Sequence, residues 1–456
     1  MPDNNAKRTE NKSLDAELFS SEAYPAEETR TYGDETDTPA RARKKSTKKK
    51  RPASKRKRSG QPYADQNRKT LFSVNRFQKP IGFFEWMSGA GRRESRGRTI
   101  KILGHEITFW PFFLVLMALV LVGAIVLDNA SIQVDSNTVT IVGLPADLEG
   151  YTLLVISDLN GSRFGDEQNS LLRRIQSLDY DCVFLLGDMV GKGGDAQPLY
   201  ELLEGLGTRK PVYFICGDSD PGPYVPTARN ITGTLEQMLL EDWILGAMER
   251  GAIYVDSPIC VEVDSAKLWL SPATMLNINA ANNQARYEDQ VAQETDGVLA
   301  GLDADYASIP YTTYRKQLAV ELATAVANMN ATDVHLSLAH QVPSDELIDA
   351  SCAHDATSKT YLTEADLILA GHSCGGVMRL PLIGAFYIDI PSLDRYGWFP
   401  AKEDVSGLSV VSESQVYITK GLSTNSNVPL MPFRLLNQPQ ISVITLTAKL
   451  PDSMLG

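Results

Sequence analysis

Five polar segments, each directly after an apolar run, hold the side chains best suited to chemistry. They are Asp158-Leu159-Asn160, Gly187-Asp188, Gly217-Asp218-Ser219-Asp220, His340, and His372-Ser373-Cys374. Carboxylate and imidazole groups together are suitable ligands for Mn²⁺, Zn²⁺ or iron. A single Asp at the end of a strand is usually a helix cap. Five such segments in succession instead predict a divalent metal site.

The runs that precede these segments predict an α/β domain. Short runs rich in apolar and β-branched residues predict strands at 138–144, 151–157, 181–188, 211–218, 333–340 and 366–371. Apolar residues at helical spacing predict helices at 166–178, 196–206, 234–250 and 312–329. Because helices alternate with strands, the sheet should be parallel, and the polar segments should meet beyond the carboxyl ends of its strands.

Less regular segments complete the expected domain of residues 137–450. Shorter strands are predicted near 252–271, 377–390, 415–419 and 440–447. The polar stretch from 276 to about 311 contains several Asn and acidic residues, and we expect it to be an insertion on the surface.

Charge divides the 456-residue chain into two unlike parts. The net charge is −12, but residues 1–106 carry 25 Lys or Arg against 14 Asp or Glu, and the remainder carries 19 against 42. At the boundary, residues 107–127 (ITFWPFFLVLMALVLVGAIVL) contain no charge. At about 1.5 Å per residue they reach roughly 30 Å, which predicts a single transmembrane helix. A buried helix or a cleaved signal peptide is the alternative.

The flanks of this apolar segment predict its orientation. Basic residues, among them Arg98 and Lys101, precede it, whereas Asp128 and Asp135 follow it. Positive residues usually remain in the cytoplasm. We therefore expect a single-pass protein of the cell membrane, with a cytoplasmic N-terminus and an extracytoplasmic C-terminal domain.

Residues 1–100 are expected to be a disordered, basic cytoplasmic tail, because they are polar and offer few positions for a core. In the run 41–58 (RARKKSTKKKRPASKRKR), 12 of 18 residues are basic. Such a run can bind nucleic acid. Beside a membrane segment, attraction to anionic lipid at ~1 kcal/mol per basic residue is the simpler interpretation. A solvated tail that helps to set the topology is the alternative.

The motifs VISDLNG, LLGDMVG, ICGDSD, LAHQVP and ADLILAGHSCGGVMRLP occur in the order D-x-[HN], G-D, G-[ND]-x-[DE], H and G-H-x-[HC]. Over about residues 143–448 this order resembles the calcineurin-like metallophosphoesterases, in particular a membrane-anchored bacterial branch. The resemblance implies a four-layer α/β/β/α sandwich and a two-metal site that hydrolyses phosphoesters. It matches Asp188 to the bridging ligand, Asp158 to the first metal, and His340 and His372 to the second.

The chain departs from the family pattern at four positions. Asn160 and Cys374 stand where the family has histidine ligands, and Asp218 stands where it has asparagine. Ser219 replaces the histidine that approaches the phosphate. Serine can hydrogen-bond a phosphate, but it cannot act as a general acid near neutral pH.

The resemblance thus leaves a degenerate metal site. The second metal keeps four candidate ligands, which are Asp188, Asp218, His340 and His372. The first keeps Asp158 and Asp188, with Asn160 and Cys374 as altered candidates. A thiolate favours Zn²⁺ or another soft ion, whereas an amide oxygen is a weak donor. We expect one divalent ion (Mn, Zn or Fe), with two ions as the alternative.

Three functions are compatible with these residues. The first is a metal-dependent phosphoesterase at the outer face of the membrane, with Asp188, Ser219 and Asp220 as candidate catalytic residues. Its substrate would be a phosphomonoester, phosphodiester or pyrophosphate in a small molecule, a lipid or a cell-envelope compound. The second is a pseudoenzyme that serves as a binding or scaffolding domain. The third is a Cys–His hydrolase or transpeptidase that uses Cys374. Nearby carboxylates oppose it, because a nucleophilic thiolate needs a lowered pKa.

Overall fold

The computed structural model describes residues 99–102, 105–299, 308–354, 359–376, 378–380, 383–388, 397–424 and 434–449. The tail predicted at 1–100 lies, except for its last two residues, outside this range.

The predicted apolar segment 107–127 forms a helix over most of its length. A hairpin of β1 (Thr99–Ile102) and β2 (His105–Thr108) leads into helix α3 (Phe109–Ala130). Within the described part of the chain, however, no helix is both long and apolar enough to cross a membrane. The predicted transmembrane span is therefore not supported.

The first sheet of the domain has six strands in the order β3-β18-β4-β5-β6-β7. Their bounds are β3 Gln133–Thr140, β4 Thr152–Ile156, β5 Cys182–Leu186, β6 Val212–Ile215, β7 Ala252–Tyr254 and β18 Gln440–Thr447. Strands β4 to β7 are parallel to one another, whereas β18 pairs with β4 in the antiparallel sense. The parallel half agrees with the predicted alternation of strands and helices.

The second sheet also has six strands, in the order β16-β17-β11-β10-β9-β8. Their bounds are β8 Ile259–Val263, β9 Ala266–Pro272, β10 Val334–Leu338, β11 Leu367–Ala370, β16 Gly407–Val411 and β17 Ser414–Ile418. The four central strands are parallel, and the two edge strands β8 and β16 are antiparallel to their neighbours.

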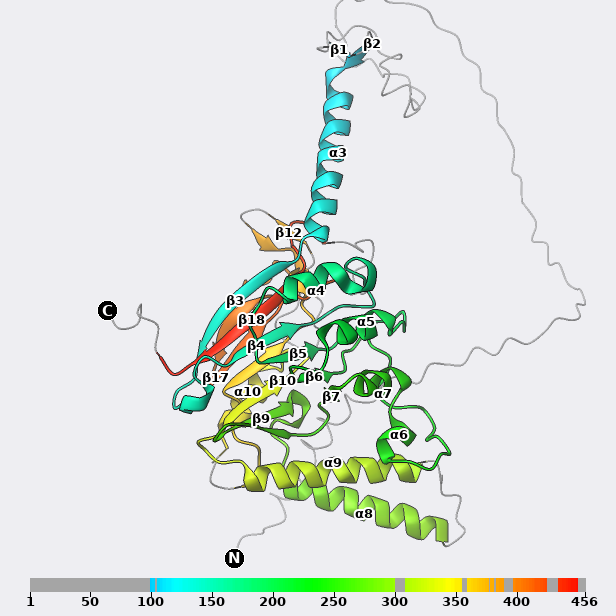
Figure 1. Cartoon of the computed structure of the whole chain (residues 1–456), viewed down its shortest axis with the longest axis vertical. Helices are drawn as coiled ribbons and strands as arrows, with labels where there is room; N and C mark the ends of the chain where they lie inside the picture. Colours follow the sequence, from blue (N-terminus) through cyan, green and yellow to red (C-terminus); the bar gives the residue numbers. More distant parts are fainter. Residues whose placement is uncertain are drawn as a thin grey trace, which may run out of the picture. The chain divides into compact units, whose positions relative to one another are not determined.

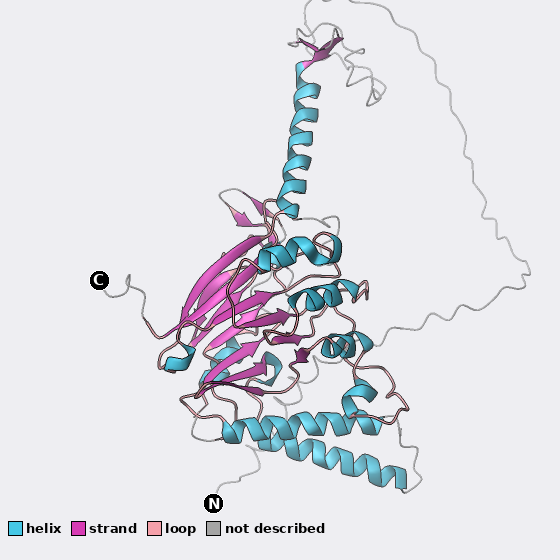
Figure 2. Ribbon diagram, in the orientation of Figure 1, coloured by secondary structure: helices cyan, strands magenta, loops and turns pink. Residues whose placement is uncertain are grey.

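Alternating side chains of the strands separate the two faces of each sheet, as the pleat requires. On β4, Leu153 and Val155 pack with Leu268 and Leu336 of the second sheet. Leu154 of the same strand faces the helices. Each fully buried aliphatic side chain contributes roughly 1.5–3 kcal/mol to this core. The result is an α/β sandwich in which two sheets pack face to face (Figures 1 and 2).

Helices cover the outer faces of both sheets. They are α4 (Asn169–Ile175), α5 (Gln197–Leu206), α6 (Leu235–Leu239), α7 (Asp242–Glu249), α8 (Ala280–Leu299), α9 (Ser308–Asn328) and α10 (Asp345–Cys352). Residues of α4, α5 and α7 pack on the first sheet. Leu322 of α9 packs with Trp269 of β9, and Ile348 of α10 packs with Ile368 of β11.

One helical prediction differs from the structure. The segment 234–250 is two short helices, because the chain is extended at Leu240 and Glu241 between α6 and α7. The polar stretch expected as a surface insertion from 276 contains the regular helix α8, which packs along α9 (Figure 1). Although its sequence is mostly polar, one face of α8 packs against α9.

Candidate metal centre

Each predicted metal-ligating carboxylate or imidazole lies just beyond the carboxyl end of a strand. Asp158, Asp188 and Asp218 follow the parallel neighbours β4, β5 and β6 of the first sheet. His340 and His372 follow the parallel neighbours β10 and β11 of the second sheet. One sheet therefore supplies the carboxylates and the other supplies the imidazoles.

The backbone at these strand ends adopts a conformation that few residues accept. Asp158, Asn160, Asp188, His372 and Cys374 all have positive φ, between 46° and 62°. Such positions cost of order 1–3 kcal/mol each and concentrate at functional sites. The surrounding fold holds five of the predicted site residues in this conformation, which fixes the direction of their side chains.

Four side chains converge into a group that could hold a metal ion, and we name Asp188, Asp218, His340 and His372 the Asp–His cluster. One ligand atom from each lies within 4.8 Å of all the others. The Nε2 atom of His340 is 2.8 Å from Oδ1 of Asp218 and 3.3 Å from Oδ1 of Asp188. Nδ1 of His372 is 3.0 Å from the same Asp218 oxygen.

A backbone carbonyl orients the central imidazole. Nδ1 of His340 lies 2.7 Å from the carbonyl oxygen of Leu186, the last residue of β5. A carbonyl can only accept, so Nδ1 carries a proton and donates it. Nε2 is left to face the cluster. Metal-binding histidines typically have such a second partner, which fixes the ring and its tautomer.

The charges of the cluster act strongly on one another. Burial alone would lower the pKa of His340, but Asp188 and Asp218 raise it well above its ordinary value. Burial would likewise raise the pKa of Asp218, but hydrogen bonds from His340 and His372 bring it well below its ordinary value. The two carboxylates therefore favour positive charge at the centre of the cluster.

The donor set fits a divalent cation. It combines two carboxylates and two imidazoles, which suit Zn²⁺, Mn²⁺ or iron. Oδ2 of Asp188 is buried and has no hydrogen-bond partner among the described residues. An unpartnered buried carboxylate oxygen is costly, and a bound cation would satisfy it.

The predicted ligands of a first metal form a separate group beside the cluster. Asp158 is fully buried, and its carboxylate accepts hydrogen bonds from Ser157 Oγ at 2.5 Å and from Cys374 Sγ at 3.5 Å. Burial is the main cause that raises the pKa of Asp158. Cys374, predicted as an altered metal ligand, is thus a hydrogen-bond donor to Asp158 in this structure.

Asn160 lies against the loop after β5. Its backbone N–H donates to the carbonyl of Asp188 at 2.7 Å. Its Nδ2 atom is buried and makes no hydrogen bond within the described part of the structure. A Cβ at Gly191 would lie 2.8 Å from Oδ1 of Asn160, so only glycine fits at position 191.

Ser219 and Asp220 differ in where they point. The backbone N–H of Ser219 donates to Oδ1 of Asp188 at 2.8 Å, and Ser219 Oγ is another buried atom without a described hydrogen-bond partner. The carboxylate of Asp220 instead accepts from three backbone N–H groups, of Val190, Gly191 and Gly217, at 2.8–2.9 Å. It therefore ties the loops after β5 and β6 together.

Glycine allows the two loops to approach this closely. A Cβ at Gly217 would overlap the backbone nitrogen and Oδ1 of Asp188, and one at Gly187 would lie 2.8 Å from Nδ1 of His340. The repeated Gly-Asp pairs of the sequence are thus a packing requirement of the site.

Two groups of the site were not predicted from the sequence. They are Ser157, whose hydroxyl donates to Asp158, and the carbonyl of Leu186, which accepts from His340.

Two further histidines, His335 and His354, lie apart from the cluster. His335 is buried, with Nε2 2.8 Å from Ser271 Oγ and Nδ1 2.8 Å from the carbonyl of Thr363. His354 stacks on Tyr361 at 3.6 Å. No disulfide joins any of the five cysteines.

Comparison with known proteins adds little to this description. No family model matches the chain, and no curated protein matches it. Among solved structures, phosphopantetheinyl hydrolase (PptH) from Mycobacterium tuberculosis has 13% identity and a TM-score of 0.29, covering 60% of this chain and 91% of its own. TT1561 of Thermus thermophilus has 10% identity and a TM-score of 0.25, with 60% and 90% covered. Likenesses this weak carry no inference about function.

Proposed function

We propose that the chain is a metal-dependent phosphoesterase that binds one divalent ion at the Asp–His cluster. The observation that carries this proposal is the convergence of two carboxylates and two imidazoles from two sheets, with ligand atoms within 4.8 Å. The order of motifs along the chain, similar to that of the calcineurin-like metallophosphoesterases, supports the same interpretation. On this proposal the α/β sandwich is the four-layer sandwich of that family.

The residues of the cluster have distinct parts in this proposal. Asp188, Asp218, His340 and His372 would hold the ion, which supplies a Lewis acid for a phosphoryl oxygen. The carbonyl of Leu186 keeps Nε2 of His340 directed at the ion. The buried hydroxyl of Ser219, next to Asp218, is available to hydrogen-bond a phosphate oxygen.

The proposal counts one ion because two of the other candidate ligands, Asp158 and Cys374, are already hydrogen-bonded to each other. The Asp158 carboxyl accepts from Ser157 and Cys374, and the amide of Asn160 is a poor substitute for imidazole. Asp220 is better described as a positioning residue than as a catalytic one, because its carboxylate is occupied by backbone N–H groups.

Hydrolysis of bis(4-nitrophenyl) phosphate by the full chain tests the proposal. The assay compares Mn²⁺, Zn²⁺ and Fe²⁺ with a chelated control. The Asp188→Asn variant should lose at least about 100-fold in kcat/KM, because it removes a ligand of the ion. Asp179→Asn, an exposed residue before β5, is the matched control and should keep full activity. Absence of hydrolysis with every metal and ester class would refute the proposal.

The second candidate is a pseudoenzyme, a metal-binding or scaffolding domain without turnover. It is favoured by Ser219, which cannot supply the proton that a leaving group needs. Stoichiometric metal binding without hydrolysis is its signature, and efficient turnover by the wild type would exclude it.

The cellular location and the substrate are proposals from the sequence. The division of charge along the chain motivates a domain at the outer face of a membrane, acting on a phosphorylated small molecule, lipid or cell-envelope compound. Protection of the domain from added protease in intact cells would contradict this location.

A further inference from the structure

A group of basic side chains surrounds the turn that follows His372. Residues Cys374–Gly376 form this turn, and β12 (Arg379–Leu380) follows it. Nη1 of Arg379 donates to the carbonyl of Gly375 at 3.3 Å. The side chain of Lys420 packs over the same turn, since a Cβ at Gly375 would lie 2.9 Å from its Cγ. Two cations thus flank the loop that carries His372. Lys402 begins a turn that touches the same loop, because its carbonyl accepts from the Val405 N–H at 3.3 Å and the Val405 carbonyl accepts from Ser373 Oγ at 2.7 Å.

This group lies next to the candidate metal centre. Lys420 comes two residues after β17, whose neighbour in the sheet is β11, the strand that leads to His372. The next residue, Gly421, packs directly against the Asp158 carboxylate. The Asp158 side of the site is where the predicted imidazole ligands are replaced, so these cations border the part of the site that has lost metal ligands.

The positive charge of the group is poorly balanced. Burial lowers the pKa of Lys420, and the nearby charges of Arg379, Arg434 and Lys402 lower it further. Asp135 is the acidic group that opposes them. Its carboxylate already accepts from Tyr417 at 2.8 Å and Gln440 at 3.1 Å.

Apart from Arg434, the cations of this group have no ion-pair partner among the described residues. None of the ion pairs between described residues includes Arg379, Lys402 or Lys420. Arg434 differs from them, because it is buried and donates to the carbonyls of Lys420 and Gln438. It supports the loop. Arg379 makes one hydrogen bond, to Gly375, and no described ion pair neutralises its charge or that of Lys402 and Lys420.

We propose that Arg379, Lys402 and Lys420 form a subsite for a second anionic group of the substrate. A half-buried cluster of like charges is unfavourable unless an anion neutralises it, and Arg and Lys bind phosphate and carboxylate through charge-assisted hydrogen bonds. The substrate would then carry a phosphate or a carboxylate in addition to the phosphoryl group placed at the Asp–His cluster. This inference rests on the proposed phosphoesterase function, which it narrows to doubly anionic substrates.

Matched ligand pairs test the subsite by calorimetry on the metal-loaded full chain. 3-Phosphoglycerate and glycerol 3-phosphate differ in one carboxylate, and pyrophosphate and phosphate differ in one phosphate. The ligand with the second anion should bind about tenfold more tightly, as expected for one charge-assisted contact. The pair that shows the larger ratio identifies which anion the subsite prefers.

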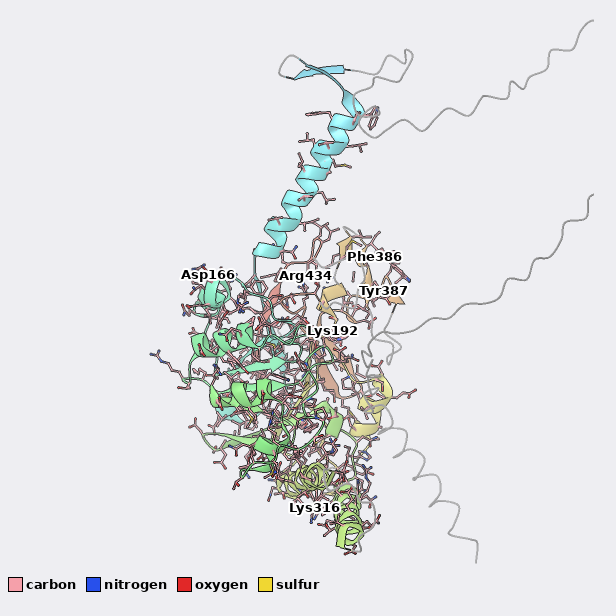
Figure 3. The ribbon with its side chains drawn as sticks, turned by 90° about the vertical axis from the view of Figure 1, so that its right-hand side faces the viewer. Asp166, Lys192, Lys316, Phe386, Tyr387 and Arg434 are labelled. Atoms are coloured by element: carbon pink, nitrogen blue, oxygen red, sulfur yellow. The ribbon has the colours of Figure 1, made fainter. Side chains whose placement is uncertain are left out.

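Variants that each remove one positive charge test which side chains cause the tenfold difference in affinity. Arg379→Gln and Lys420→Gln should each abolish most of the tenfold ratio. Lys402→Gln replaces an exposed side chain and therefore tests the subsite without risk to folding. The control is Lys316→Gln on α9, at the end of the domain opposite to Arg434 (Figure 3), which should keep the ratio.

The outcomes separate the two proposals. Equal affinities within both pairs, or ratios that survive all three substitutions, would overturn the subsite even if esters are hydrolysed. Ratios that depend on the three cations, found in a chain without hydrolysis, would support the subsite and count against the phosphoesterase.

Discussion

Nδ1 of His340 lies 2.7 Å from the carbonyl oxygen of Leu186, so a hydrogen bond joins the end of β10 in one sheet to the end of β5 in the other. The bond lies directly behind the Asp–His cluster. It fixes the distance between the sheets at the point where their ligands meet, and it directs Nε2 toward the two carboxylates. The same hydrogen bond therefore joins the two sheets and orients the imidazole of His340.

His340→Gln should lower the affinity for Mn²⁺ or Zn²⁺ by about 10–100-fold, because it removes both a ligand and its fixed orientation. Calorimetric titration measures the loss. His354→Gln is the control, since His354 lies outside the cluster and stacks on Tyr361. Equal affinity of the wild type and the His340 variant would show that the ion binds elsewhere.

Gly217→Ala should destabilise the fold by a steric clash at the site, without changing any polar group. The added Cβ would overlap Asp188, and overpacking of this kind typically costs about 1–3 kcal/mol. Gly222→Ala is the matched control, because nothing lies within 4 Å of its Cβ position. Urea unfolding of both variants provides the comparison. A Gly217 variant as stable as the Gly222 variant would contradict the close approach of the two loops.

The sequence located the side chains that form the Asp–His cluster because each apolar strand ends abruptly in a polar residue. That pattern located Asp188, Asp218, His340 and His372 before their contacts were known. The role of the Leu186 carbonyl could not be predicted, because every residue has a backbone carbonyl and the sequence does not show which one contacts His340. The cations Arg379 and Lys420 are brought together only by the pairing of β11 with β17, which local patterns do not encode.

Helix α8 shows a second limit on predicting the fold from the sequence. Its polar composition indicated a surface insertion, and only its contact with α9 reveals a helix with one packed face. The division into two sheets was likewise implied by the family resemblance and not by the strand pattern, since both sheets contain similar parallel strands.

Asp220→Asn should weaken the site without touching the ion. The amide cannot accept from three backbone N–H groups as the carboxylate does, which should cost about 1–3 kcal/mol of unfolding free energy. Metal affinity should fall about tenfold because the loops after β5 and β6 lose their common anchor. A variant with lost turnover but unchanged stability and metal affinity would instead indicate a direct catalytic role.

The number of bound ions should change when the missing imidazoles are restored. Metal analysis of the wild type should find one ion per chain. The double variant Asn160→His, Cys374→His should bind two, because it supplies two ligands beside Asp158 and Asp188. Two ions in the wild type would contradict our account of the Asp158 side.

Burial raises the pKa of Asp366 to about 6, although the carboxylate accepts the His335 backbone N–H at 2.8 Å. The folded chain therefore binds this proton more tightly than the unfolded chain. The resulting stabilisation is complete below about pH 4 and is lost as the pH rises through about 6. Asp366→Asn removes this dependence, so relative to the wild type the variant should gain about 1–3 kcal/mol between about pH 4 and pH 7.

Urea unfolding at both pH values measures this change, with the exposed Asp179→Asn as control. A difference in unfolding free energy between the Asp366 variant and the wild type that is the same at both pH values would show that Asp366 has an ordinary pKa.

Metal content and phosphodiester hydrolysis, measured on one sample of the full chain, test the central claim most directly. We predict one ion per wild-type chain, hydrolysis that ceases when the ion is chelated, and loss of both ion and activity in Asp188→Asn. Hydrolysis that persists in the metal-free chain, or an Asp188→Asn variant that keeps its ion and its activity, would contradict a metal centre built on the Asp–His cluster.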